Sequence, residues 1–340
     1  TLPLRDLLYA ALVKSANDAA NVIAESISGD MNTFVGLMNQ AAAVYGCTNT
    51  NFTNPNGLHN DNHYTTARDM AMIAMEAMKN ETFRQMVATD SYTIPATSQM
   101  RARSVSTSNR LMIPPTEERA NKYYFPDAIG IKTGTTTRAG YCFVGAAERD
   151  GVELISVLFF TGENARWADT IKLMNYGFSQ YMSVTPVDLY NMNPITVETK
   201  NFSLEDTNMG KLPLPCVSTD ASNTARIIAT PDEIDVMASN LRDTVLIEYT
   251  REFYAPITAG EVMGTMTYYP DDGGSAVVYD LVASRNVMRR ENAPLTLEEI
   301  EHLVFSDPNP FPPLTLDILL LFLSPLIVLV LLIMVLRRIF

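Results

Sequence analysis

Two short motifs in this chain combine side chains that can hydrogen-bond and carry charge: Ser15-Ala16-Asn17 and Lys132-Thr133-Gly134. A serine hydroxyl and an asparagine amide each donate and accept hydrogen bonds, and a lysine ammonium is a charged donor. The first motif falls between two predicted helices, and the second lies at the end of a predicted strand. Either tripeptide alone is frequent by chance. Plainer interpretations are that Ser15 is a helix N-cap and that Lys132 is a solvated strand residue.

The elements that must position these motifs change character near Tyr123. Apolar residues at helical spacing predict helices over 4–12, 17–27, 31–45 and 66–78. The segment 49–64 is rich in Asn, Pro and Gly, which predicts a loop. Period-two runs then predict strands over 128–133, 141–147 and 153–160, the last two joined by a turn at Arg149-Asp150-Gly151. An amphipathic pattern over 165–178 predicts one more helix.

Beyond Phe178 we see no helical pattern of any length. Strand-like runs separated by turn residues occur over 195–199, 244–249, 264–269 and 276–283. They predict a small all-β domain over 184–290 that follows a first domain over 1–180. Residues 291–315 are polar and rich in proline, and we interpret them as a stalk.

The most apolar part of the chain is its C-terminal end. Residues 318–336 contain no charge, and as a helix they are about 28 Å long, close to the roughly 30 Å hydrocarbon core of a bilayer. We therefore predict a transmembrane helix over 316–338. Arg337 and Arg338 favour a cytoplasmic C-terminus, which places the residues before 315 outside. A buried core helix is the alternative, but no polar face alternates with the apolar residues.

Charge and ligand-forming residues exclude several classes of function. The chain has 340 residues, with 25 basic and 38 acidic side chains and a formal net charge of −13, which argues against nucleic acid as a partner. Its three cysteines are far apart and form neither a disulfide framework nor a metal cluster. His59 and His63 lie four residues apart without the glutamate of a His-Glu-x-x-His helix. We predict no metal site and no cofactor.

In their order and setting, the two motifs resemble the second and third motifs of serine penicillin-recognising enzymes. The flanking sequence over roughly 1–180 is similar to the D-alanyl-D-alanine carboxypeptidase family of low-molecular-weight penicillin-binding proteins. The segments that carry this resemblance are Leu7-Leu8-Tyr9, Ser15 to Ala20, Asn54 to Leu58, His63 to Met70, Asn109-Arg110-Leu111, Gly130 to Gly134 and Ala139-Gly140-Tyr141. Downstream, Ala255-Pro256-Ile257, Gly260 and Gly264 resemble the β-rich domain that follows in this family.

The resemblance implies an α+β penicillin-binding, β-lactamase-like transpeptidase domain made of helices and an antiparallel sheet. It implies a serine-type enzyme that removes the terminal D-alanine from peptidoglycan stem peptides through an acyl-enzyme, with β-lactam antibiotics as inhibitors. The chain would then be anchored in a bacterial cell membrane, in contact with the lipid bilayer through one C-terminal span, with its catalytic region extracytoplasmic.

The resemblance also assigns catalytic roles. Ser15 would relay a proton to the leaving D-alanine, and Asn17 would bond the substrate amide and orient a lysine of the nucleophile motif. Lys132 would favour an anionic transition state.

Four further residues would bind substrate according to the same resemblance. Thr133 and Thr135 would offer hydroxyls to the substrate carboxylate, and Gly134 would let the backbone approach. Arg166 would clamp the terminal carboxylate, a bidentate task that lysine performs poorly. The competing interpretation of Arg166 is an ordinary surface residue of a helix.

One family feature is missing: no serine in the chain is followed three residues later by lysine, and no Gly-x-Ser-x-Gly occurs. In the family the nucleophile motif precedes the first helix seen here. We therefore expect an N-terminally truncated chain that cannot acylate alone and whose incomplete sheet has an unpaired edge. Two alternatives are a class A β-lactamase-like hydrolase and a non-catalytic, membrane-tethered protein that binds the cell wall.

Overall fold

The computed structural model describes residues 2–219, 225–270 and 273–291. Its described residues fall into two compact units. The first lies within residues 1–193, 216–247 and 266–279, and the second within 194–215, 248–265 and from Asp280 onward. Helices and antiparallel sheets both contribute to the fold, so the predicted α+β class is confirmed.

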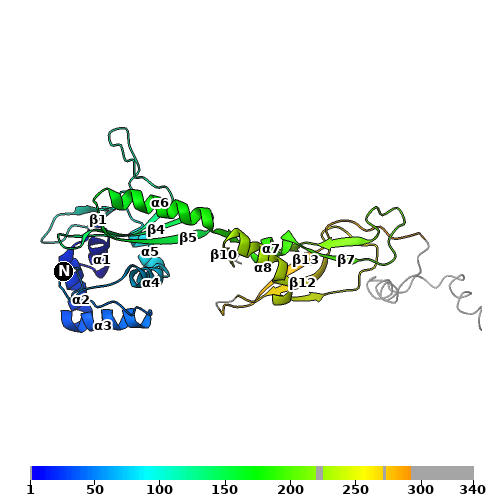
Figure 1. The fold of residues 1–340 in the computed structure, drawn as a ribbon, viewed down its shortest axis with the longest axis horizontal. Coiled ribbons are helices and arrows are strands. Elements are labelled where there is room, and N and C mark those ends of the chain that lie inside the picture. The colour runs from blue at the N-terminus through cyan, green and yellow to red at the C-terminus, as the bar shows by residue number, and fades with distance from the viewer. Residues whose placement is uncertain (1, 220–224, 271–272, 292–340) are drawn as a thin grey trace, which may run out of the picture. The chain divides into compact units, whose positions relative to one another are not determined.

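Five helices precede the main sheet in the sequence (Figure 1). They are α1 (Leu4–Leu12), α2 (Asn17–Ser28), α3 (Met31–Val44), α4 (Ala67–Met78) and α5 (Glu81–Val87). Side chains that accept a backbone hydrogen bond fix three of the starting points, at Asp30, Thr66 and Asn80. Gly29 ends α2 with a left-handed φ of 82°. The four helices predicted in this region are confirmed to within one or two residues.

The main sheet consists of β3 (Ala128–Thr136), β4 (Gly140–Arg149) and β5 (Val152–Thr161), in the antiparallel order β3-β4-β5. The turn between β4 and β5 has positive φ at Asp150 and Gly151, which explains its Asp-Gly sequence. Among the described residues β5 pairs only with β4, so its other edge is open. The side chain of Phe160 near the end of β5 is 78% exposed.

Helices cover both faces of this sheet (Figure 1). On one face, Phe143 of β4 packs with Trp167 and Met174 of α6 (Ala165–Gln180). On the other face, Ala146 packs with Met78 of α4. Neighbouring residues of β4 therefore enter two different cores, as expected for a strand covered on both sides. A separate antiparallel pair, β1 (Ser91–Ile94) and β2 (Arg103–Ser106), packs against α1 through a third core.

The remaining elements follow α6. Two short pairs are β6 (Met182–Val184) with β10 (Ile227–Ala229), and β7 (Ile195–Glu198) with β8 (Lys211–Leu214). A four-stranded sheet has the order β11-β12-β13-β9, with β9 (Cys216–Val217), β11 (Leu246–Tyr249), β12 (Val262–Tyr268) and β13 (Val277–Val282).

The prediction of an all-β region over 184–290 is wrong, because this segment contains α7 (Pro186–Met192) and α8 (Pro231–Thr244). Both helices begin with a threonine cap followed by proline, and Glu233 completes a capping box with Thr230 in α8. The described apolar stripe of α8 is thin, with only Ile234 and Leu241 buried. The sequence of α8 contains clear signals for the start of the helix but only a weak apolar periodicity.

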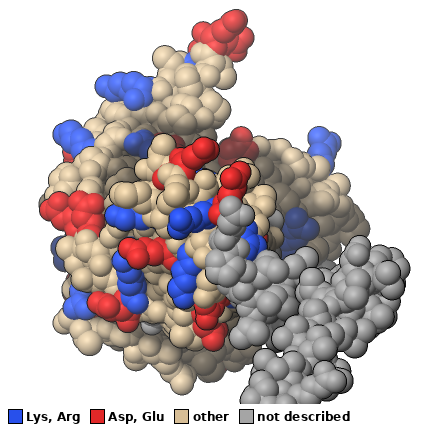
Figure 2. Space-filling view, turned by 90° about the vertical axis from the view of Figure 1, so that its right-hand side faces the viewer, with Lys and Arg blue, Asp and Glu red and all other residues tan. Residues whose placement is uncertain are grey.

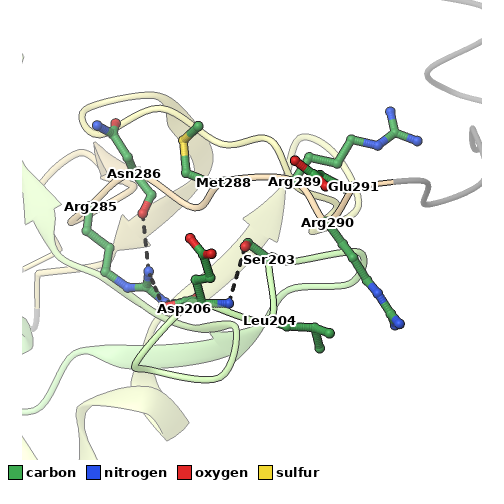
Figure 3. A pocket seen from close by; sticks show the side chains of 10 residues that line it. Ser203, Leu204, Asp206, Arg285, Asn286, Met288, Arg289, Arg290 and Glu291 are labelled. Atoms are coloured by element: carbon green, nitrogen blue, oxygen red, sulfur yellow. Dashed lines mark hydrogen bonds and ion pairs between the residues drawn. The ribbon is translucent and has the colours of Figure 1, made fainter.

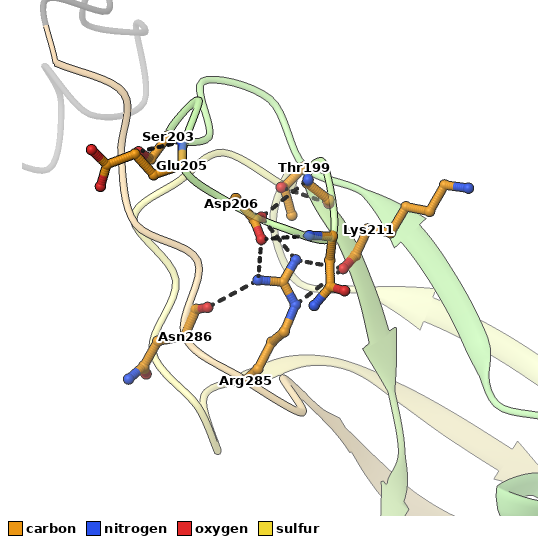
Figure 4. Close-up of polar contacts among 9 residues, drawn as sticks. Thr199, Ser203, Glu205, Asp206, Lys211, Arg285 and Asn286 are labelled. Atoms are coloured by element: carbon orange, nitrogen blue, oxygen red, sulfur yellow. Dashed lines mark hydrogen bonds and ion pairs between the residues drawn. The ribbon is translucent and has the colours of Figure 1, made fainter.

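A nearly buried ion pair organises part of the second unit (Figure 4). The Arg285 guanidinium donates to both carboxylate oxygens of Asp206 at 2.9 and 3.0 Å. It also donates to the carbonyl oxygen of Lys211, with the shorter distance 2.6 Å, and to that of Asn286. The Asp206 side chain is only 8% exposed, and its bonds with Arg285 lower the pKa of that carboxyl.

Lys and Arg side chains are interspersed with Asp and Glu side chains on the face shown in Figure 2. They form no extended basic patch among the described residues of that face, whereas binding to phosphate backbones requires one. No helix in the described part of the chain is long and apolar enough to cross a membrane. The predicted stalk beyond Glu291 and the predicted span over 316–338 lie outside the described residues.

Candidate active site

Strand β3 presents the Lys132-Thr133-Gly134 motif next to β4. Thr133 is paired with Phe143 and Thr135 with Tyr141. Because side chains alternate along a strand, the hydroxyls of Thr133 and Thr135 lie on the same side of β3. The Thr133 hydroxyl lies 2.7 Å from the Ser108 hydroxyl, which fixes its position from a neighbouring loop.

Lys132 is partly buried, and its Nζ donates a hydrogen bond to the Thr133 carbonyl oxygen at 3.0 Å. Burial and, to a smaller extent, the positive charge of Arg166 lower the pKa of Lys132 to about 8. Both effects disfavour the charged ammonium. An anion bound near these two cations would relieve their repulsion, so the pair is suited to hold a carboxylate or to stabilise a developing oxyanion.

Arg166 is 9% exposed, so its interpretation as a surface helix residue is wrong. It lies in the first turn of α6, where its guanidinium carbon is 4.3 Å from the ring centroid of Trp167 and 5.0 Å from that of Tyr141. Its Nη1 donates to the Thr135 hydroxyl at 3.4 Å. Burial lowers the pKa of Arg166, and its Nε is buried without a hydrogen-bond partner in the described structure.

The Ser15-Ala16-Asn17 motif forms the tight connection between α1 and α2. Ser15 has a positive φ of 64°, and the Ala16 amide donates back to the Ala10 carbonyl oxygen. Ala16, not Ser15, is the N-cap of α2, and no side chain caps this end. The N-cap interpretation of Ser15 is therefore wrong, and the residue is held in an uncommon backbone conformation with its side chain exposed.

The structure brings together only part of the predicted site. Thr135 and Arg166 are in contact, and Lys132 is close enough to Arg166 for their charges to interact. Within the described residues, neither Ser15 nor Asn17 hydrogen-bonds to this group. The two parts are linked through Leu12, near the end of α1, which packs against the clusters that contain Val13 and Ile131.

Gly134 sits opposite Cys142 on β4. A Cβ at position 134 would lie 3.7 Å from the Cys142 Cβ, which is an ordinary contact distance. The surrounding protein therefore leaves room for a side chain here. Gly134 is exposed, so a ligand could approach its backbone.

Sequence reasoning missed three residues that hold the site. Ser108 bonds to Thr133, and Tyr141 and Trp167 enclose the Arg166 guanidinium. Asn109, which like Tyr141 belongs to a segment that carries the family resemblance, is buried and donates from its amide to the Gly130 carbonyl oxygen at 3.4 Å. The one sequence signal for Ser108 is that it directly precedes Asn109, the first residue of a segment that carries the family resemblance.

His59 and His63 lie in the loop over 49–64. His59 contacts Asp61 at 3.1 Å, while the His63 ring nitrogen lies 3.1 Å from the Thr53 amide and accepts its hydrogen bond. Burial lowers the pKa of His63. No group of three or more possible metal ligands occurs among the residues that the structure describes.

Comparison with known proteins gives the same family as the two motifs. Residues 1–162 match the family model of the D-alanyl-D-alanine carboxypeptidases, peptidase family S11. The D-alanyl-D-alanine carboxypeptidase of Streptomyces sp. strain K15 is 38% identical over 185 residues, which cover 52% of this chain and 61% of that protein. DacF of Bacillus subtilis is 29% identical over 290 residues, covering 85% of this chain and 67% of that protein.

Two solved structures are also similar. The Streptomyces K15 DD-transpeptidase is 35% identical, with 52% of this chain and 67% of that chain covered and a TM-score of 0.46. DacD of Francisella tularensis is 26% identical, with 85% and 76% covered and a TM-score of 0.46. The chain spans 61% of the length of the Streptomyces relative and 42% of that of DacC of Escherichia coli. The match over residues 1–162 and these relatives show that this part of the chain belongs to the D-alanyl-D-alanine carboxypeptidase family.

Proposed function

We propose that this chain carries the substrate-binding half of a serine-type D-Ala-D-Ala carboxypeptidase that trims peptidoglycan stem peptides. The observation that carries the proposal is the pair of cations around β3, with buried Arg166 bonded to Thr135 and Lys132 close by. A peptide that ends in D-Ala-D-Ala has a terminal carboxylate, and a guanidinium with a neighbouring hydroxyl binds such a group in a bidentate manner.

The proposed reaction is acyl transfer in two steps. A serine hydroxyl attacks the carbonyl between the two D-alanines, its proton passes to the leaving amine, and D-alanine departs. Water then hydrolyses the acyl-enzyme. Lys132 and Arg166 stabilise the negative charge of the tetrahedral state and of the leaving group's carboxylate. Ser15 relays the proton to the leaving D-alanine, and Asn17 hydrogen-bonds to the substrate amide. β-Lactams act as acylating mimics of the dipeptide.

The nucleophile of this reaction lies outside residues 1–340 in our proposal. The support is the sequence itself, which contains no Ser-x-x-Lys. A lysine three residues after the nucleophile would share a helix face with it and act as its base. None of the serines named above has such a neighbour.

We further propose that residues 316–338 span the bacterial cell membrane and that the site faces the exterior. The uncharged run over 318–336 and the following Arg337 and Arg338 support this orientation. Alkaline extraction of membranes tests it, since the full chain should stay in the membrane pellet and residues 1–316 should be released. Release of the full chain would contradict the anchor.

Release of D-alanine tests the activity directly. A longer polypeptide that includes the nucleophile segment should release D-alanine from a peptide ending in D-Ala-D-Ala and hydrolyse penicillin slowly. Fast penicillin turnover without D-alanine release would favour the β-lactamase alternative. Stable binding to cell walls without either reaction would favour a non-catalytic protein.

A further inference from the structure

A cavity of about 720 Å³ opens in the first unit at α8, the end of β12 and strand β10. Large apolar and aromatic side chains line it, and several are exposed to solvent. Val236 and Met237 on α8 are 59% and 39% exposed, and Tyr269 after β12 is 54% exposed. Apolar groups gathered around a concave surface, rather than scattered singly, are typical of a ligand site.

Polar side chains, among them Arg226 and Asn240, accompany these apolar walls. Arg226 is the single charged residue among the described residues that line the cavity, and Asn240 lies one helical turn beyond Val236 on α8. Neither side chain forms a hydrogen bond or ion pair with any residue in the described ranges. Arg226 is exposed and has no carboxylate partner among the described residues, so it can pair with an anionic group of a ligand.

The other large cavity, about 700 Å³ in the second unit, differs in this respect (Figure 3). One of the three arginines that line it, the partly buried Arg285, is bound to Asp206 and to two carbonyl oxygens. Arg285 therefore has a structural role in that cavity, whereas the side chain of Arg226 has no bonded partner among the described residues.

We propose that the cavity at α8 binds a polysaccharide strand of N-acetylated sugars that carries carboxylates. Sugar rings and acetyl methyl groups have apolar faces that pack on Tyr269 and Met237. The Asn240 amide bonds to hydroxyl or acetamido groups, and Arg226 pairs with a carboxylate. The inference rests on the proposed function, because the glycan to which stem peptides are attached is such a strand.

An apolar peptide is less well matched to this lining. It would cover Arg226 and Asn240 without satisfying their hydrogen bonds, which costs binding free energy. A polysaccharide presents polar groups around every ring, so it can satisfy both side chains while its apolar faces cover the tyrosine and methionine.

The experiment is a calorimetric titration of the full chain in nanodiscs with two soluble oligomers of equal length. One alternates N-acetylglucosamine with N-acetylmuramic acid and lacks peptides, so it carries carboxylates. The other is a neutral chitin oligomer. We expect the Tyr269→Ala variant to bind both oligomers about tenfold more weakly. We expect Arg226→Gln to weaken only the carboxylate-bearing oligomer, bringing it to the affinity of the neutral one.

Matched controls are Tyr176→Ala, which removes an exposed tyrosine on α6, and Arg119→Gln, which removes an exposed arginine away from the cavity. Both should bind as the parent chain does. Absence of saturable binding up to about 10 mM of either oligomer would overturn the proposal, as would unchanged binding in the cavity variants or displacement of the oligomer by an apolar peptide. Because binding requires no bond cleavage, such a failure is distinct from a failure of the D-alanine release test.

Discussion

Arg166 at the start of α6 donates from Nη1 to the Oγ1 of Thr135 on β3 at 3.4 Å, while the rings of Trp167 and Tyr141 flank its guanidinium. This contact joins a helix to the edge strand of the sheet and fixes a buried cation beside a hydroxyl. The pairing leaves part of the guanidinium fork without a protein partner, since Nε is unbonded in the described structure. In the proposed function, this arrangement is what would bind the terminal carboxylate of the substrate.

Replacing Arg166 by lysine should keep the positive charge but lose the bidentate geometry. We expect kcat/KM for a peptide ending in D-Ala-D-Ala to fall about tenfold or more in the longer polypeptide that carries the nucleophile. The same peptide with a C-terminal amide should be almost insensitive to the change. The control is Arg138→Lys, at an exposed arginine that pairs with Asp61. Equal loss for the acid and the amide would contradict carboxylate binding by Arg166.

Lys132 should titrate with a pKa of about 8. Its folded pKa is below the unfolded value near 10.5, so the unfolded chain binds more protons between these two pH values. The free energy of unfolding should therefore rise with pH across this window because of Lys132, and Lys132→Met should remove that rise. Carbon NMR of the Lys132 side chain measures the titration. Arg166→Met should raise the pKa only partly, because burial is the larger cause.

A pKa of Lys132 that stays near 10.5 in the folded protein would contradict the buried, cation-flanked environment. A suitable internal reference is Lys172, an exposed lysine on α6 that pairs with Asp169. Its signal is compared with that of Lys132 in the same spectra.

The contact between Ser108 and Thr133 should make a small but measurable contribution to the free energy of unfolding. Ser108→Ala removes the hydroxyl that lies 2.7 Å from the Thr133 hydroxyl, and since Ser108 is exposed we expect a loss of less than about 1 kcal/mol in unfolding free energy. The coupling in a double-mutant cycle with Thr133→Val should account for most of it. Ser98→Ala, at an exposed serine elsewhere, is the control. A coupling of zero would show that Ser108 does not position Thr133.

The ion pair between Asp206 and Arg285 should contribute far more to stability. Arg285→Met leaves a nearly buried carboxylate without its partner, and we expect a loss of about 3–5 kcal/mol in urea denaturation. Lys200→Met breaks a pair whose side chains are each 67% exposed, so its loss should be below about 1 kcal/mol. Similar losses for the two variants would contradict the difference in burial.

The ion pair between Asp206 and Arg285 should also make the free energy of unfolding depend on pH. Because the folded pKa of Asp206 is lowered, its stabilising contribution is present above the unfolded pKa of 3.8 and is lost as pH falls through the lower folded value. Asp206→Asn should flatten this part of the stability profile.

Local patterns in the sequence predicted the first helices, the strands β3 to β5 and helix α6, because each has a strong apolar period or clear start signals. Helix α8 was missed since few of its residues are buried, although Thr230, Pro231 and Glu233 marked its start. Lys132, Thr133 and Arg166 were assigned to the candidate site through motif resemblance, and that assignment stays a prediction. Ser108 and Trp167 were missed as parts of the site because their contacts depend on packing between segments distant in the sequence, which no local pattern encodes.

Covalent labelling by a fluorescent penicillin tests the central claim most directly. It is applied to the 340-residue chain and to a longer polypeptide that retains the upstream coding sequence with a Ser-x-x-Lys motif. We predict that the longer polypeptide is labelled on that serine and that the 340-residue chain is not labelled. Labelling of the 340-residue chain on one of its own serines, or a longer polypeptide that stays unlabelled, would contradict it.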